Sequence, residues 1–263
     1  ENKEKVKDYD SKIELIFMRH EEKENDKTKN DEEVRLTQAG KMRAKEKAEM
    51  DDISQSMAFG TSRKRTQETT GLVMSGKLDE ITGTETLEEL KEKLDKDLPL
   101  ESGSKIRVDD RLNFEADFSS NYVKKAIEAL KKGEYLKFFV ERSDESAKEE
   151  KDEKSSTYTR QARSVASIVK KYLEIAPRFN KLVQDKDKNY EDTLKRFFGS
   201  HQGVLECFLA KMIENIKGAE ERDKFVQALN NQGFDYAEGF NIEIKNKESG
   251  DPTIHISYKK EED

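Results

Sequence analysis

The sequence places two of its few histidines where apolar runs end. Three histidines occur in 263 residues: His20, His201 and His255. In "IELIFMRHEEK", residues 13–23, an apolar run passes directly into Arg19 and His20. A neutral imidazole is a nucleophile or proton carrier, and an arginine guanidinium pairs with phosphate or carboxylate oxygens through two parallel hydrogen bonds. The two side chains together predict a site for an anionic reacting group.

Two further runs that read as short strands are followed by the same kinds of residue. In "GTSRKRTQETT", the run 56–60 is followed by Arg65 at the start of a predicted helix. In "FGSHQGVLE", the run 194–199 is followed by His201, and Gly203 permits a tight turn before the next helix. Ligands of open α/β sheets bind beyond the carboxyl ends of the strands. We therefore expect both arginines and both histidines to converge on one pocket that accepts a phosphoryl group.

The elements around these junctions have the pattern of a parallel α/β sheet. Residues 13–18 are apolar on both alternating faces apart from Glu14, which suits a strand covered by helices on both sides. Helical spacing is clearest over 123–130 and 158–172. The alternation of strands with helical patterns predicts a three-layer α/β/α sandwich with a mostly parallel central sheet.

The C-terminal segment and one middle segment complete the outline. Residues 240–258 alternate, turn at 250–252 and alternate again, which predicts a β-hairpin in which His255 is an exposed strand residue without a role. The stretch "SDESAKEEKDEKSS", residues 143–156, has almost no apolar content and predicts a mobile, charged surface insertion. We expect a single domain spanning residues 1–263.

Composition excludes several classes of protein. The net charge of -7 is spread over interleaved Lys and Glu, which argues against a nucleic-acid partner. No apolar stretch approaches the roughly 20 residues that cross a bilayer, so we expect a soluble, cytoplasmic protein without a membrane partner. The chain begins at Glu1 without Met, so a removed leader would change that location. The single cysteine, Cys207, excludes an intrachain disulfide and is expected to be buried.

Four motifs together resemble those of the histidine phosphatase superfamily, also called phosphoglycerate-mutase-like. "IFMRHEE" resembles a strand ending in Arg-His-Gly, and "RLTQAGKMRA" is similar to a Leu-Thr pair followed by a helix-opening Gly. "TSRKRTQET" resembles the family's Arg followed four residues later by Thr, here Arg65 and Thr69. "GSHQGV" is similar to Ser-His-Gly-Gly. Four motifs in the family's order are far more specific than one Arg-His pair.

The resemblance implies a mechanism. His20 would attack phosphorus and form a phosphohistidine, which splits one difficult displacement into two easier ones. Arg19, Arg65 and His201 would stabilise the charge on the transferring group. The family requires no metal ion or other cofactor for this chemistry. The expected partner is a phosphorylated small molecule or a phosphoprotein.

The resemblance also implies a proton donor from a middle segment. The family uses an acidic residue that follows a short strand, and "KIRVDDRLNFEADF" resembles that segment. Glu115 is the best match and Asp117 is the alternative. A carboxyl group at this place would protonate the leaving oxygen as a general acid.

Two positions depart from the family's pattern. Glu21 replaces the glycine beside the nucleophile, and Gln202 replaces the first glycine after the second histidine, where we expect it to bind substrate. A carboxylate at 21 that pointed inward would repel phosphate. Glu21 therefore either faces away from the pocket or binds a cationic part of the substrate.

Three readings of the function follow. The mutases' substrate-binding residues after the first motif are not reproduced in "EKENDKTKNDEE", so we favour hydrolysis of phosphomonoesters. A phosphoglycerate-type mutase is the enzymatic alternative. The third reading is a non-catalytic module that binds a phosphorylated ligand and has lost turnover through Glu21 and Gln202. The sequence leaves the substrate and the oligomeric state open.

Overall fold

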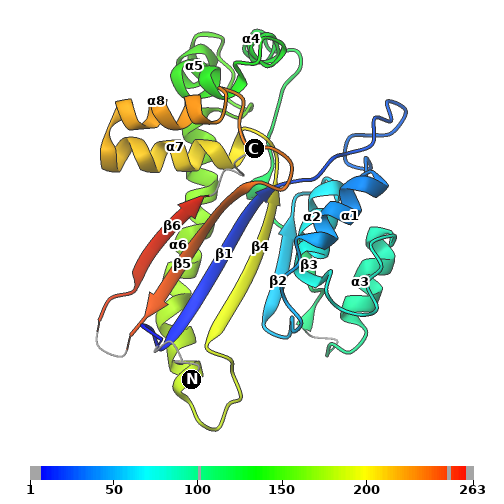
Figure 1. Ribbon diagram of the computed structural model, residues 1–263. Helices are drawn as coiled ribbons and strands as arrows, with labels where there is room; N and C mark the ends of the chain where they lie inside the picture. Colours follow the sequence, from blue (N-terminus) through cyan, green and yellow to red (C-terminus); the bar gives the residue numbers. More distant parts are fainter. Residues whose placement is uncertain (1–6, 100–101, 248–249, 259–263) are drawn as a thin grey trace.

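The fold is built on one six-stranded sheet with the strand order β3-β2-β4-β1-β5-β6 (Figure 1). The computed structural model describes residues 7–99, 102–247 and 250–258. The first four strands of this order are parallel, whereas β5 runs antiparallel to β1 and pairs with β6 as a hairpin. The strands are β1 Ser11–Arg19, β2 Ser56–Gly60, β3 Ile106–Val108, β4 Thr193–Ser200, β5 Gly239–Asn246 and β6 Thr253–Tyr258.

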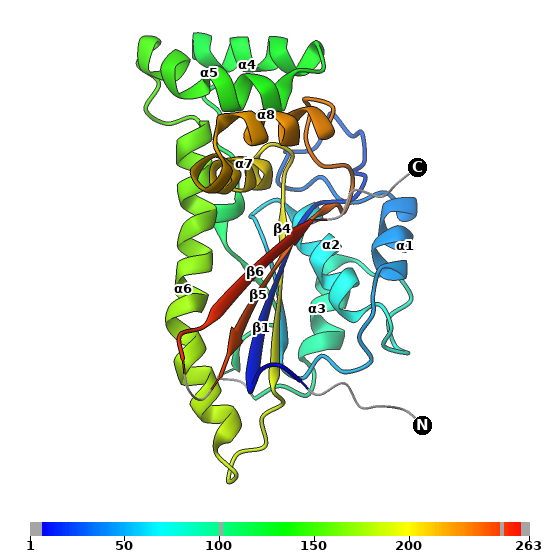
Figure 2. The same cartoon turned by 60° about the vertical axis from the view of Figure 1, so that its left-hand side comes forward.

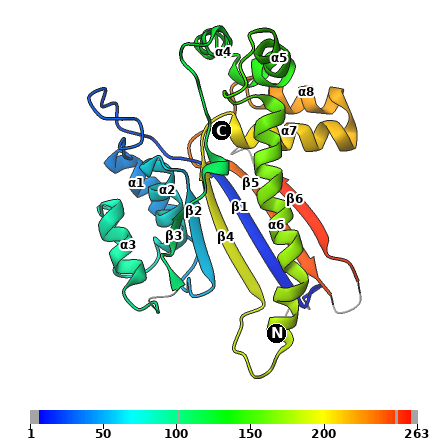
Figure 3. The same cartoon turned by 180° about the vertical axis from the view of Figure 1, so that it is seen from behind.

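Helices form a layer on each face of the sheet, which confirms the predicted three-layer α/β/α sandwich. Figure 2 shows the long helix α6 on one side and α1, α2 and α3 on the other, and Figure 3 shows α6 crossing the strands. Helices α4, α5, α7 and α8 gather beyond the end of β4 (Figure 1). The helices are α1 Gln38–Glu46, α2 Lys64–Ser75, α3 Leu87–Asp95, α4 Asn121–Lys131, α5 Tyr135–Glu149, α6 Tyr158–Gln184, α7 Val204–Lys217 and α8 Ala219–Ala228, with the 3-10 turn η2 Asp110–Leu112.

The central strand β1 is held by aromatic packing on the α6 side. Ile13, Leu15 and Phe17 are buried there at alternate positions, as the period of a strand requires. Phe17 stacks on Phe198 of β4 and Phe240 of β5, with ring centroids 4.7 and 4.8 Å apart. Each such pair contributes about 0.5 to 1.5 kcal/mol beyond the area it buries. This packing fixes the end of β1, where Arg19 and His20 follow.

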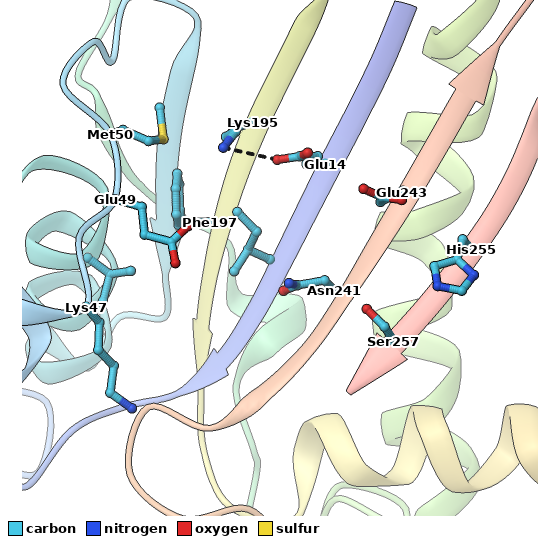
Figure 4. Close-up of a pocket in the computed structure, with 12 residues that line it drawn as sticks. Glu14, Lys47, Glu49, Met50, Lys195, Phe197, Asn241, Glu243, His255 and Ser257 are labelled. Carbon is cyan, nitrogen blue, oxygen red and sulfur yellow. Dashed lines mark ion pairs between the residues drawn. The ribbon is translucent and has the colours of Figure 1, made fainter. Parts of the chain in front are cut away.

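The opposite face of β1 is only partly covered, so the predicted cover on both faces is incomplete. A groove of about 480 Å³ lies on this face. Figure 4 shows the residues that line it, among them Lys47, Glu49 and Met50 of the segment that follows α1. One row of paired residues crosses the groove floor from β4 to β6: Lys195, Glu14, Glu243 and His255. Lys195 forms an ion pair with Glu14 at 3.2 Å. His255 is exposed in β6, as predicted.

The predicted loop over 143–156 is wrong for its first half, because α5 continues to Glu149. The helix buries small side chains, among them Ser143, Ser146 and Ala147. Ser143 Oγ donates to the carbonyl of Phe139 at 2.5 Å and accepts the backbone N–H of Tyr158 at 2.8 Å. A helix face made of serine and alanine lacks the apolar spacing that sequence reasoning detects.

Two further expectations concern α7 and membrane crossing. Cys207 is buried on α7, and its thiol donates to the carbonyl of Gly203 at 2.9 Å, so the predicted burial is confirmed. Gly203 precedes α7 with φ of +85°, and a Cβ there would lie 2.6 Å from the Tyr135 ring, so glycine is required. In the described part of the chain, each helix is too short or too polar to cross a bilayer.

Candidate active site

The two histidines meet where parallel strands β1 and β4 end. Arg19 and Ser200 are register partners, so the next residue of each strand, His20 and His201, leaves the sheet at the same edge. The backbone N–H of His20 donates to the carbonyl of Ser200 at 3.0 Å. The imidazole ring centroids lie 5.4 Å apart with an interplanar angle of 68°. The predicted convergence of the histidines is therefore present, and their catalytic roles remain a prediction.

A backbone contact fixes the tautomer of His20. Its Nδ1 lies 2.6 Å from the carbonyl oxygen of Glu21. A carbonyl oxygen only accepts hydrogen bonds, so Nδ1 carries the proton and Nε2 keeps its lone pair. The Nε–H of Arg65 points to this Nε2 at 3.4 Å. Burial, joined by the nearby positive charges of Arg65 and Arg19, lowers the pKa of His20 to about 3. The imidazole is therefore neutral at physiological pH.

Arg65 enters the site from the first turn of α2. That turn begins after Arg63, whose backbone is extended, and the hydroxyl of Thr66 donates to the Arg63 carbonyl at 2.8 Å. Thr69, one turn after Arg65, accepts the backbone N–H of Glu21 at 3.0 Å. The helix is thus tied directly to the residue after His20. These contacts explain why the Arg and Thr of the predicted motif stand four residues apart.

Arg19 and His201 each present a buried nitrogen without a partner in the described part of the chain: Arg19 Nε and His201 Nδ1. The other atoms of these groups are held in place. Arg19 Nη1 donates to the carbonyl of Phe234 at 2.7 Å, and its guanidinium lies 4.6 Å from the ring centroid of Tyr236. His201 Nε2 lies 3.1 Å from the hydroxyl of Thr61. Buried polar atoms normally have partners, so two unpartnered nitrogens at one sheet edge indicate a site for an anionic ligand.

Glu21 is held by a cation of the protein. Its buried carboxylate accepts from Arg43 Nε of α1 at 3.1 Å and from the backbone N–H of Glu22 at 3.2 Å. Arg43 Nη2 lies 3.1 Å from the same oxygen. The alternative in which Glu21 binds a cationic substrate group would require breaking this pair. The structure favours a structural role for Glu21.

Gln202 is engaged with the segment that precedes β5. Its Nε2 donates to the carbonyl of Gln232 at 2.8 Å. The amide nitrogen therefore has a protein partner, and substrate binding by Gln202 remains a prediction.

The two candidate acids lie in the exposed loop after η2. The backbone of Glu115 is anchored to Ser156 by two hydrogen bonds of 2.8 Å, and both acids are exposed. Phe114, the neighbour of Glu115, lies with its ring centroid 5.2 Å from that of His201, so this loop borders the site. The Asp117 carboxylate accepts from the hydroxyl and backbone N–H of Ser119, which lowers the pKa of Asp117 and makes it the poorer acid.

Sequence reasoning missed Arg63 and Asp31. Arg63 Nε donates to Asp31 Oδ2 at 2.6 Å, and Arg65 Nη2 donates to the same oxygen at 3.1 Å. Two residues apart in a helix would place these arginines on different faces, but Arg63 precedes the helix in an extended conformation. The signal was present in "TSRKRT", which contains both arginines. Asp31 lies in a loop and has no motif that could have identified it.

Glu206 was also missed. It is fully buried on the first turn of α7 and accepts the backbone N–H groups of Gly203 at 2.9 Å and Phe234 at 2.7 Å. Complete burial raises the pKa of Glu206 to about 7, although these hydrogen bonds oppose the shift. Because the Phe234 carbonyl binds Arg19, Glu206 positions that arginine indirectly. A Glu three residues after the helix start is a readable capping signal.

Comparison with known proteins places the fold. No protein-family model matches the chain, and no curated protein sequence matches it. Among solved structures, a mycobacterial glucosyl-3-phosphoglycerate phosphatase aligns with 94% of this chain and 98% of its own, at 13% identity and a TM-score of 0.51. A phosphoglycerate mutase from Bacillus anthracis aligns with 95% of this chain and 93% of its own, at 12% identity and a TM-score of 0.53. The chain therefore has the histidine phosphatase, or phosphoglycerate-mutase-like, fold.

Proposed function

We propose that the protein is a phosphatase that hydrolyses phosphomonoesters through a phosphohistidine on His20. The observation that carries the proposal is the arrangement around His20 Nε2. This nitrogen carries the lone pair of the ring and meets the Arg65 Nε–H only at a long 3.4 Å, and the unpartnered Arg19 Nε and His201 Nδ1 belong to the same site. A phosphoryl group would satisfy both nitrogens while its phosphorus faced the nucleophile.

The reaction has two displacements. His20 Nε2 attacks phosphorus, the bond from phosphorus to the ester oxygen breaks, and the departing alcohol takes a proton from Glu115. Water then attacks the phosphohistidine and gives a proton to the Glu115 carboxylate, the P–N bond breaks, and inorganic phosphate leaves with His20 and Glu115 restored. Arg19, Arg65 and His201 stabilise the charge on the phosphoryl oxygens in both steps, so the chemistry proceeds without a metal ion.

Two alternatives are separated by what happens to the phosphohistidine. A phosphoglycerate mutase has a similar fold, so transfer of the phosphoryl group to a second acceptor is the first alternative. A mutase would hold the label until such an acceptor arrives, whereas a hydrolase loses it to water. A non-catalytic module for a phosphorylated ligand is disfavoured because Arg43 already compensates the charge of Glu21.

The test is rapid quenching during turnover of p-nitrophenyl phosphate in the presence of a chelator. We expect phosphate on His20 in a bond that survives alkali and breaks in acid, as a phosphoramidate does. His20→Ala should abolish both labelling and turnover. His255→Ala is the matched control, because this histidine is exposed on β6, and it should behave as wild type. Full turnover in His20→Ala, or turnover that the chelator removes, would exclude the proposal.

A further inference from the structure

The Asp31 carboxylate joins two arginines of the site. One of its oxygens accepts from both Arg63 Nε and Arg65 Nη2, and Arg65 Nη1 donates to the Asp31 backbone carbonyl at 2.6 Å. Partial burial opposes ionisation of Asp31, but the hydrogen bonds from Arg63 and Arg65 outweigh it and hold the pKa well below its usual range. The loop that contains Asp31 thus places a carboxylate anion at the edge of the phosphoryl site.

Two independent chains of contacts link Arg63 to the two histidines of the site. Through Asp31 it is linked to Arg65, whose Nε contacts the nucleophilic nitrogen of His20. Through Phe114 it is linked to the other histidine: the guanidinium carbon lies 4.3 Å from the Phe114 ring centroid, and that ring lies 5.2 Å from the ring of His201. The stacked ring and the Asn113 side chain, to which Nη1 donates, hold the guanidinium in place.

The two sides of this contact differ in how firmly they are held. The Arg63 and Arg65 side chains are 16% and 3% exposed, whereas the Asp31 side chain is 44% exposed. Most residues of the surrounding loop, 24–33, are also exposed. Because ion pairs that reach solvent contribute little, displacing Asp31 costs far less than moving either arginine. The arginines are the fixed part of the site and the carboxylate is the exchangeable part.

From this geometry we infer that Arg63 provides a second anion subsite beside Arg65, and that the substrate is a phosphomonoester that also carries a carboxylate, which replaces Asp31 on Arg63. The inference rests on the proposed function for the place of the phosphoryl group. Asp31 shows that a carboxylate fits between the guanidiniums. The substrate's own carboxylate would make the same pair while its phosphoryl group binds at Arg19 and His20.

Binding of phosphonates tests the subsite without turnover, because their P–C bond is not hydrolysed. 3-Phosphonopropionate and propylphosphonate have the same chain length and differ in the terminal carboxylate. Isothermal titration calorimetry of the wild-type protein should show about 10- to 100-fold tighter binding of 3-phosphonopropionate, the range expected for a charged hydrogen-bonded pair. Equal affinities would overturn the inference.

Substitutions assign the preference to Arg63. Arg63→Leu should abolish the difference between the two phosphonates. Lys64→Leu is the matched control, since it removes a positive charge one residue away that pairs with Glu33 and Glu88, and it should keep the difference. Loss of the preference in Lys64→Leu as well would show a general field effect and overturn the subsite.

Asp31→Asn provides a second variant on the exposed loop. Because it removes the competing charge, it should tighten 3-phosphonopropionate severalfold. Weaker binding of both phosphonates would instead show that Asp31 only positions Arg65, and would overturn the exchange. Failure of the proposed function has a different signature: no labelling of His20 and no turnover, whatever the phosphonate preference.

Discussion

The imidazoles of His20 and His201 lie 5.4 Å apart, centroid to centroid, on strands that are direct neighbours in the sheet. At this separation a single phosphoryl group reaches both rings. Each ring has one nitrogen engaged with the protein: Nδ1 of His20 with the Glu21 carbonyl, and Nε2 of His201 with the Thr61 hydroxyl. The remaining nitrogens differ: His201 Nδ1 has no partner in the described part of the chain, whereas His20 Nε2 meets the Nε–H of Arg65 at a long 3.4 Å.

His201→Ala tests its task. We expect turnover of p-nitrophenyl phosphate to fall by about 10² to 10³, the usual effect of removing one donor to a developing oxyanion. Slow labelling of His20 should persist, because the nucleophile remains. Quenched-flow experiments that measure the phosphate bound to the protein in His201→Ala and in His20→Ala test this expectation. Complete loss of labelling in His201→Ala would mean that the roles of the histidines are not separable in this way.

Glu115→Gln tests the leaving-group acid. Hydrolysis of alkyl phosphates should slow by about 10² to 10⁴, the usual contribution of general acid catalysis. Aryl phosphates should be affected much less, because their leaving groups need no proton. Asp117→Asn is the comparison, since its carboxylate is already engaged by Ser119. Steady-state rates on both substrate types decide between them; an equal loss on both types in Glu115→Gln, or the alkyl-specific loss in Asp117→Asn, contradicts the assignment.

The low pKa of His20 predicts acid sensitivity. Between pH about 6.5, the unfolded value, and pH about 3, the unfolded chain binds a proton at this histidine and the folded chain does not. Stability is therefore fully present above this window and falls as the pH is lowered, by up to about 1.4 kcal/mol per pH unit. Urea unfolding at pH 7 and pH 5 measures this. The free energy of unfolding of His20→Asn should fall between these two pH values by about 2 kcal/mol less than that of the wild type. An identical loss in wild type and variant would refute the depressed pKa.

The pair between Glu21 and Arg43 predicts coupled stability. Arg43→Ala leaves the Glu21 carboxylate buried without its cation and should lower the free energy of unfolding by about 2 kcal/mol. Glu21→Gly combined with Arg43→Ala should recover most of that loss. Urea unfolding of both single variants and the double variant gives the coupling energy. Additive losses would show that the pair does not compensate the buried charge.

The parts of the fold that could be predicted are those with local signals. Strands β1, β2 and β4 were recognised because each short run gives way to a polar turn, at Arg19, Thr61 and Ser200, and then to a helical pattern, and the hairpin because its alternation is regular. The partly covered face of β1 could not be predicted, since its exposure depends on which helices lie over the sheet. The extension of α5 was missed because its buried face contains Ser143 and Ser146 in place of large apolar residues.

The candidate site likewise contains residues with a local sequence signal and residues without one. Arg19, His20, Arg65 and His201 follow strand ends, so sheet topology alone brings them together. The contact of Arg63 with Asp31 spans 32 positions and depends on the path of a loop without a periodic pattern. Such a contact has no local signature, and the charge balance of the site could be described only from the structure.

The hydrogen bond from His20 Nδ1 to the Glu21 carbonyl has an evolutionary consequence. The acceptor is a main-chain atom, so every amino acid at position 21 supplies it equally. No single substitution there deletes the acceptor that selects the tautomer of His20. The side chain at position 21 is therefore limited by space and charge rather than by this hydrogen bond, and a glutamate is accommodated beside His20 because Arg43 pairs with it.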